Sequence, residues 1–188
     1  MAEFFPALTE EHRAFVAKQP VFFVATAGAG DTRINLSPKG MDCFRILDER
    51  TVAYLDVGGS GNETNAHLAA DGRITIMFCA FDRPALIFRI YGHGRAVLPQ
   101  DDEWTALAPH FTLLPGTRQI FVVAVDQCQT SCGWGVPFMA FERERQTLSK
   151  AHGHFTPEQL VEKWADRTRS IDGLPVRVPT EVPPELSA

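Results

Sequence analysis

Short apolar runs, rich in β-branched and aromatic residues, dominate the chain between residues 21 and 127. Runs of this length and composition are typical of β-strands. The turn-forming stretch Gly-Ala-Gly-Asp at 28–31 separates the first two runs and predicts a hairpin between them. Strands are predicted over residues 21–27, 32–37, 51–57, 73–81, 85–92 and 118–127.

Helical signals lie before, between and after these runs. Thr9 can cap a first helix that Pro20 ends, and Thr156-Pro157-Glu158-Gln159 has the sequence of a helix start. The proline-rich tail at 178–188 is expected to be extended and mobile. Helices are predicted over residues 9–19, 62–70, 100–109 and 156–165.

The strands outnumber the helices between them, and tight turns join two of the strand pairs. This pattern favours a mainly β fold, an antiparallel barrel with flanking helices, over a doubly wound parallel sheet. The chain has 188 residues, enough for one core. We expect an N-terminal helix in 1–19, a barrel domain in 20–150, and a C-terminal helix with its extended tail in 151–188.

Composition excludes several classes of function. The net charge is −5 and both halves are balanced, so nucleic acid and anionic membranes are poor partners. No apolar run approaches the length of a membrane span, and the acidic N-terminus does not resemble a secretory signal. The four cysteines lack the spacing of a zinc site and are expected to be reduced, in a cytoplasmic protein without a bound metal.

A glycine-rich stretch, Gly58-Gly59-Ser60-Gly61-Asn62-Glu63-Thr64, follows a predicted strand and precedes a predicted helix. Backbone amides in such a turn, together with the positive end of the helix, can bind a phosphate. The side chains of Ser60, Asn62 and Thr64 add short donors. The alternative interpretation is a capping box between Ser60 and Glu63, which needs no ligand.

A second polar cluster occurs on the strand that follows the first turn. Alternation places Arg33, Asn35 and Ser37 on one face, and Lys39 follows after Pro38. We expect Pro38 to end the pairing and to place Lys39 at a strand end, where ligands often bind. An ordinary solvated strand face is the alternative.

Two further features are candidates for ligand contact. Arg89 interrupts an apolar run, so it must reach water, an acid or an anionic ligand. Gly133 and Gly135 flank Trp134, which indicates a tight loop presenting a flat ring to a ligand, to a second subunit or to the core.

The chain lacks any recognisable set of catalytic side chains. Its six histidines are scattered, no serine lies in a nucleophile elbow, and no carboxylate pair stands out. Groups for holding an anion and a flat ring are more plentiful, which indicates a cofactor that supplies the reactivity. The catalytic residues and the substrate are not assigned.

The motifs INLSPKG, YLDVGGSGNETNAHL, RITIMFCAF and PALIFRIYGHG, in this order, resemble the pyridoxamine 5′-phosphate oxidase-like family. QTSCGWGVP and SIDGLP resemble one subgroup of that family. The resemblance covers about residues 20–175 and implies a six-stranded antiparallel split barrel. It also implies a homodimer with FMN bound at the dimer interface.

The resemblance carries functional residues over to this sequence. It implies FMN contacts from the strand 33–39, from the loop that ends at Thr64, from Arg89, and from Gly133 and Trp134 of a second subunit. One departure is that Asn62-Glu63 stands where pyridoxamine phosphate oxidases have an Arg-Lys pair, so vitamin B6 oxidation is not the expected reaction. The implied FMN-contacting residues are Arg33, Asn35, Ser37, Lys39, Ser60, Gly61, Asn62, Glu63, Thr64, Arg89, Gly133 and Trp134.

The expected function is therefore that of an FMN-binding flavoprotein, a flavin-dependent oxidoreductase of unknown substrate. Two alternatives stay open. One is a non-catalytic flavin-binding or carrier protein, which the missing Arg-Lys pair favours. The other is a split barrel that uses a deazaflavin or haem instead of FMN.

Overall fold

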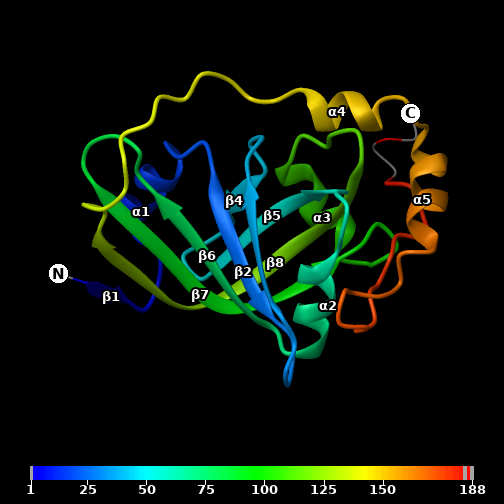
Figure 1. Cartoon of the computed structure of the whole chain (residues 1–188), viewed down its shortest axis with the longest axis horizontal. Helices are drawn as coiled ribbons and strands as arrows, with labels where there is room; N and C mark the ends of the chain where they lie inside the picture. The colour runs from blue at the N-terminus through cyan, green and yellow to red at the C-terminus, as the bar shows by residue number, and fades with distance from the viewer. Residues whose placement is uncertain (1, 184–185, 187–188) are drawn as a thin grey trace.

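The computed structural model describes residues 2–183 and 186 and has a strongly curved antiparallel sheet at its centre (Figure 1). The sheet order is β3-β2-β6-β7-β8-β5-β4, and β1 pairs with β8 outside this path. Over the described residues the strands are β1 (Glu3–Phe5), β2 (Phe22–Ala27), β3 (Ile34–Lys39), β4 (Phe44–Ile46), β5 (Thr51–Val57), β6 (Arg73–Cys79), β7 (Leu86–Val97) and β8 (Thr117–Cys132).

The expected mainly β class with flanking helices is confirmed, and all six predicted strands are present. The described chain has eight strands rather than six, because β1 and β4 add three residues each. Runs this short carry no readable periodicity. The strands β7 and β8 extend beyond the predicted ranges, and β8 continues from the predicted end at residue 127 to Cys132.

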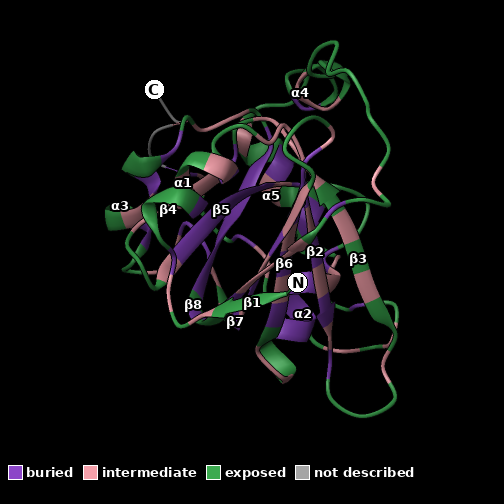
Figure 2. Ribbon diagram, turned by 90° about the vertical axis from the view of Figure 1, so that its left-hand side faces the viewer, coloured by how far each residue is buried: buried purple, intermediate pink, exposed green. Residues whose placement is uncertain are grey.

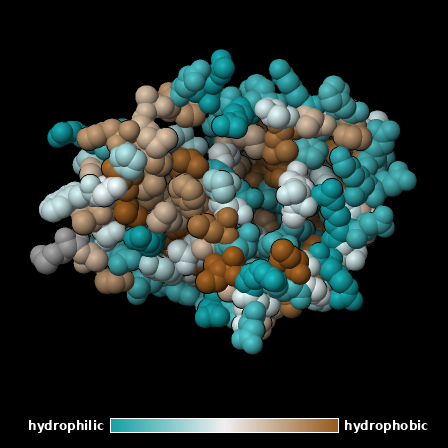
Figure 3. All heavy atoms as spheres, viewed as in Figure 1, coloured by the Kyte–Doolittle hydropathy of each residue, from teal (hydrophilic) through white to brown (hydrophobic). Residues whose placement is uncertain are grey.

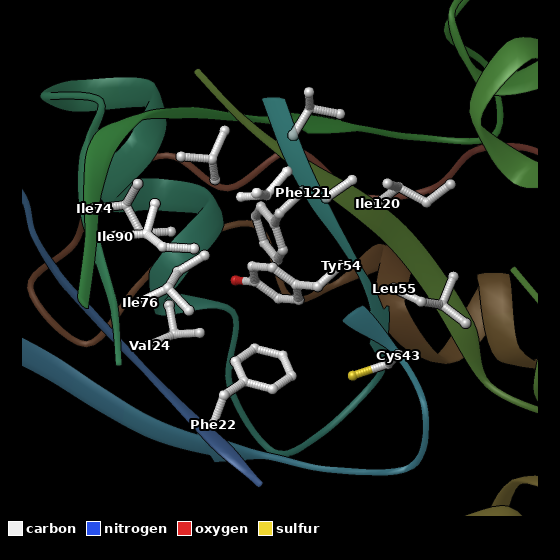
Figure 4. Packing of buried hydrophobic residues seen from close by; sticks show 14 of the residues in the cluster. Phe22, Val24, Cys43, Tyr54, Leu55, Ile74, Ile76, Ile90, Ile120 and Phe121 are labelled. Carbon is white, nitrogen blue, oxygen red and sulfur yellow. The ribbon is translucent and has the colours of Figure 1, made fainter. Parts of the chain in front are cut away.

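Alternation along the strands builds the core. In β2, Phe22, Val24 and Thr26 are buried, while the residues between them are only half-buried. Figure 4 shows Phe22 and Val24 pointing toward Tyr54 and Ile76, which come from β5 and β6. The barrel interior is therefore filled by apolar side chains, and polar groups capable of binding a ligand lie at its edge and ends.

Pro38 does not end the strand as we predicted. It lies within β3 and is paired with Phe23 of β2. The strand β3 is at the edge of the sheet, where a residue without an N–H group is tolerated because one side of the strand has no partner. Lys39 therefore continues the ladder, opposite Phe22.

The helices pack outside the sheet, and two of them begin with capping boxes at the threonines predicted from the sequence, Thr9 and Thr156. The helix α4 was not predicted, and the predicted helix at 100–109 is only one α-helical turn and a 3-10 turn. The helices are α1 (Glu10–Val16), α2 (Glu63–Ala70), α3 (Trp104–Leu107), the 3-10 turn η1 (Ala108–His110), α4 (Thr147–His152) and α5 (Pro157–Ala165).

Two long segments without regular structure cross the molecule. Residues 133–146, here called the strap, connect β8 to α4 and pass along the top of the view in Figure 1. After α5 the chain returns along the sheet, and Gln100 hydrogen-bonds to the backbone of Val178 and Thr180. The described part of the tail is thus extended but packed, while 184, 185, 187 and 188 lie outside the described residues. Within those limits, no helix reaches the length and apolarity that a membrane span requires.

Candidate functional site

The glycine-rich loop, residues 58–62, connects β5 to α2 and is fixed firmly at its first residue. The N–H of Gly58 donates to the carbonyl of Gly116 at 2.8 Å, and its carbonyl accepts from His152 Nε2 at 2.6 Å. A Cβ at position 58 would lie 2.6 Å from the ring of Trp164, so any other residue would force this ring to shift. This end of the loop is closed to any ligand.

The other end of the loop is open. A Cβ at Gly59 would meet nothing within 4 Å, and one at Gly61 would meet only the Glu63 side chain at 3.8 Å. The N-cap residue of α2 is Asn62, which forms no side-chain cap hydrogen bond. The alternative capping box between Ser60 and Glu63 is therefore wrong, and the first amides of α2 are left for another acceptor.

A buried polar network lies beneath this loop. Asp56 accepts two hydrogen bonds from Arg118, at 3.0 and 2.8 Å, and one from Gln119 at 2.8 Å. Gln119 also donates to Asn62 at 2.7 Å and accepts from Asn65. The loop and the first turn of α2 are thus fixed to the barrel by buried side-chain hydrogen bonds, although the Asn62 side-chain nitrogen has no partner among the described residues.

Asp56 is the acidic group of this network, and its ionisation state depends on its neighbours. Burial by itself would raise the pKa of the Asp56 carboxyl, but the Arg118 guanidinium and the Lys39 ammonium outweigh burial, so the pKa is lowered. Arg118 also donates to the carbonyl of Gly61 at 3.1 Å. The carboxylate is ionised at neutral pH and aligns one guanidinium directly under the loop.

The polar face of β3 contacts the start of α2 and the buried network under the loop. Asn35 donates to the hydroxyl of Thr64 at 3.2 Å, and Ser37 donates to Asn35 at 3.3 Å. Lys39 forms an ion pair with Asp56 at 3.2 Å. Residues from two distant parts of the sequence therefore meet at one edge of the barrel.

The segment that follows α5 completes the rim of the site. Arg167 donates to the carbonyl of Gly59 at 2.9 Å. Glu63 does not cap its own helix but accepts from the N–H of Ile171 at 3.1 Å. Arg33, which precedes β3, forms an ion pair with Asp172, and its N–H donates to the same carboxylate at 2.8 Å. These contacts of Arg33 lower the pKa of Asp172.

Arg89 lies apart from this rim. The register places it beside Met77 and Gln129, on the sheet face opposite to the buried neighbours Phe88 and Ile90. Its guanidinium donates to the hydroxyl of Ser131 at 3.1 Å. The structure therefore does not bring Arg89 into contact with the glycine-rich loop.

Gly133 and Trp134 are also remote from the loop of their own chain. They follow Cys132, the last residue of β8. Gly58, by contrast, hydrogen-bonds to Gly116, which directly precedes the first residue of that strand. Trp134 is 87% exposed, so its ring is not a core residue. Within one chain these two residues cannot complete the site.

Sequence reasoning missed the residues that support the loop. Asp56 and Arg118 sit at the ends of apolar strand runs, which was a readable signal because a charge there must be paired. The contacts from Trp164, Arg167 and Asp172 carried no local signal, since they lie about 100 residues further along the chain. Across the described residues, no group of three or more His, Cys, Asp or Glu side chains is arranged to hold a metal.

Comparison with known proteins places the chain in a family. The model of the pyridoxamine 5′-phosphate oxidase family matches residues 8–132. The chain belongs to this family. The family protein ustO of Aspergillus flavus is 32% identical to it over 194 residues, covering 93% of this chain and 78% of ustO.

Two solved structures of similar fold extend this result. HupZ of Group A Streptococcus has a TM-score of 0.52 at 23% identity, covering 65% of this chain and 98% of its own. A pyridoxamine 5′-phosphate oxidase-related, FMN-binding protein of Nostoc punctiforme has a TM-score of 0.50 at 12% identity, covering 69% of this family member and 87% of its own chain. At these low sequence identities the two comparisons show a similar fold and nothing more specific.

Proposed function

We propose that this protein binds FMN through the open end of the glycine-rich loop and acts as a flavin-dependent oxidoreductase. The observation that carries the proposal is the uncapped start of α2 beside the open positions Gly59 and Gly61. Free backbone amides at the start of a helix suit the terminal phosphate of a flavin nucleotide, because the neighbouring glycines carry no side chain that would block its approach. The FMN binding of the Nostoc punctiforme relative supports the choice of cofactor.

The surrounding side chains fit a doubly charged phosphate, although the rim also holds acids. Arg167 brings its guanidinium to the loop, Arg118 lies beneath it, and Arg33 is held by Asp172, next to the Ile171 N–H that binds Glu63. Asp172 is already paired with the Arg33 guanidinium. A phosphate must therefore share this guanidinium with the Asp172 carboxylate or displace the carboxylate from it. Asn35, Ser37 and Lys39 continue the donor set along β3, where they would orient the cofactor.

The chemistry would come from the cofactor, and the chain would control it. A bound flavin supplies reversible hydride transfer. Donors on β3 would favour the negatively charged reduced form, because a fixed positive charge stabilises developing negative charge. Lys39 is the best placed, since its ammonium is half-buried and held in position by Asp56.

We further propose a homodimer with the cofactor at its interface. The outward face of β3 leaves Ile34 and Leu36 77% and 65% exposed on an edge strand. Exposed apolar side chains on a sheet edge favour association with another surface. A second chain is also the way in which Trp134 would approach the loop, since it cannot do so within its own chain. Gel filtration at the monomer mass would contradict this part of the proposal.

One pair of matched variants tests the cofactor site. Arg33→Gln removes an exposed arginine that is paired with an aspartate beside the loop, and Arg95→Gln removes an exposed arginine that is paired with Glu103 elsewhere. We expect Arg33→Gln to weaken FMN binding about tenfold, because it removes a charge-assisted contact to phosphate. Titration of FMN into each protein measures this.

Equal FMN affinity in the two variants would show that Arg33 does not contribute to the cofactor site. A protein that is colourless as purified, and whose melting temperature does not rise with excess FMN, would overturn flavin binding altogether. Anaerobic addition of NADH or NADPH to the FMN-loaded protein then separates the oxidoreductase from a flavin carrier. Bleaching of the visible flavin absorbance indicates an oxidoreductase, and an unchanged spectrum with both reductants favours the carrier.

A further inference from the structure

A cavity of about 880 Å³ opens between the strap and the β2–β3 hairpin. Its walls come from the segment between α1 and β2, the hairpin strands, the β6–β7 connection, the strap and the first turn of α4. The strap is attached beside it where the N–H of Met139 donates to the carbonyl of Phe81 at 3.0 Å. Figure 1 shows the strap standing away from the strands here, and Figure 3 shows brown apolar surface around a hollow on the same face of the molecule.

Much of the cavity wall is apolar and includes aromatic rings. Phe23 and Phe81 contribute from the sheet, and Met139 and Phe141 contribute from the strap. The two strap residues are 61% and 59% exposed, although they line a concave surface. A cavity of this size with aromatic walls suits a ring-containing small molecule, because burying those side chains against a ligand is favourable.

The charges around the cavity are biased toward one sign. The lining includes Lys18, Lys39, Arg143 and Arg145 against only Asp82 and Glu144. The whole chain, by contrast, has a net charge of −5. Lys39 and Arg143 are already paired, with Asp56 and Glu142, whereas among the described residues Lys18 and Arg145 form no salt bridge and are available to a ligand. These two unpaired cations can therefore pair with an anionic group of a ligand.

We propose that this cavity binds a small molecule that combines an apolar ring system with an anionic group, such as a carboxylate or sulfonate. Lys39 borders the cavity and also belongs to the donor strand of the cofactor site. The identification of this molecule as the reaction partner of the flavin therefore rests on the proposed function, while binding itself does not. The strap acts as the outer wall of the cavity and supplies part of its charge.

Isothermal titration with anilinonaphthalene sulfonate, an aromatic anion, tests the proposal on the protein as purified. Neutral phenylnaphthylamine is the matched probe without the charge. We expect one sulfonate molecule per chain. We expect the double variant Lys18→Glu with Arg145→Glu to weaken sulfonate binding about tenfold and to leave phenylnaphthylamine binding within about twofold.

The control variant is Arg50→Glu with Lys163→Glu, which reverses two exposed charges outside the cavity and is expected to bind both probes like the parent. Phe141→Ala removes an exposed ring of the strap. It is therefore expected to weaken the binding of both probes without unfolding the protein. Equal sulfonate affinity in the two charge variants, or no stoichiometric binding by the parent, would overturn the proposal. The flavin content of the same samples, read from visible absorbance, separates failure here from failure of the proposed function.

Discussion

The glycine-rich loop and the strap are both irregular segments that follow a strand and precede a helix, yet they are held very differently. The loop is fixed at Gly58 by Gly116, His152 and Trp164, and from below by Arg118. In the strap, Trp134, Phe138, Met139 and Phe141 are all between 59% and 87% exposed. Figure 2 shows buried residues on α2, the helix that follows the loop, and mostly exposed ones on the connection that leads to α4.

This contrast indicates two kinds of binding surface. A loop that is already fixed by buried hydrogen bonds binds its ligand without an ordering cost. The strap instead presents apolar side chains that few residues of its own chain cover, so a ligand or a second chain would contribute most of its contacts. We therefore expect substitutions under the loop to affect folding, and substitutions on the strap to affect binding alone.

The largest expected effect on stability is that of Arg118→Met. The substitution removes the two hydrogen bonds and the buried charge that Arg118 supplies to the Asp56 carboxylate, which keeps only the Lys39 ammonium and the Gln119 amide, and a poorly compensated buried charge is strongly unfavourable. We expect the free energy of unfolding in urea at neutral pH to fall by about 3–5 kcal/mol.

The control for this variant is Arg95→Met, which breaks the half-exposed pair with Glu103. It is expected to cost less than about 1 kcal/mol, because water screens that pair. If both variants lose the same stability, the network under the loop does not stabilise the fold as the geometry implies.

An intermediate effect is expected for Gly58→Ala. The new methyl group would overlap the Trp164 ring, which must shift together with α5, at a cost of about 1–3 kcal/mol. Gly59→Ala is the matched control, since nothing lies within 4 Å of the added Cβ, and we expect it to stay within about 0.5 kcal/mol of the parent. Thermal unfolding of the two variants measures the difference, and equal melting temperatures would show that Trp164 does not confine the loop.

The smallest effect on stability is expected on the strap. Trp134→Ala should change the free energy of unfolding by less than about 0.5 kcal/mol, because the ring is 87% exposed. If Trp134 reaches the flavin of a second chain, FMN affinity falls in this variant by up to about tenfold through lost ring contacts. Phe138→Ala, which alters another exposed strap residue, is the control for FMN titration, and equal affinity in both variants would exclude the role of Trp134.

Much of the framework could be predicted from the sequence because it depends on local patterns. Short runs rich in β-branched and aromatic residues at 51–57 and 73–81 identified β5 and β6, and Thr156-Pro157 located the start of α5. Short strands such as β4 were missed because three residues hold no period. Pro38 was misjudged because whether a strand lies at an edge depends on sheet order, which the local sequence does not contain.

The candidate site divides in the same way. The sequence alone determined which residues have suitable chemistry: a glycine-rich turn before a helix, and a strand with alternating donors. Only the tertiary structure decided that Asn35 reaches Thr64, that Glu63 binds the backbone of Ile171 instead of capping its helix, and that Asp172 faces Arg33. The physical reason is that chemical type and short-range periodicity are properties of neighbouring residues, whereas hydrogen-bond partners separated by as many as 139 positions meet only after the sheet has curved and the chain has returned.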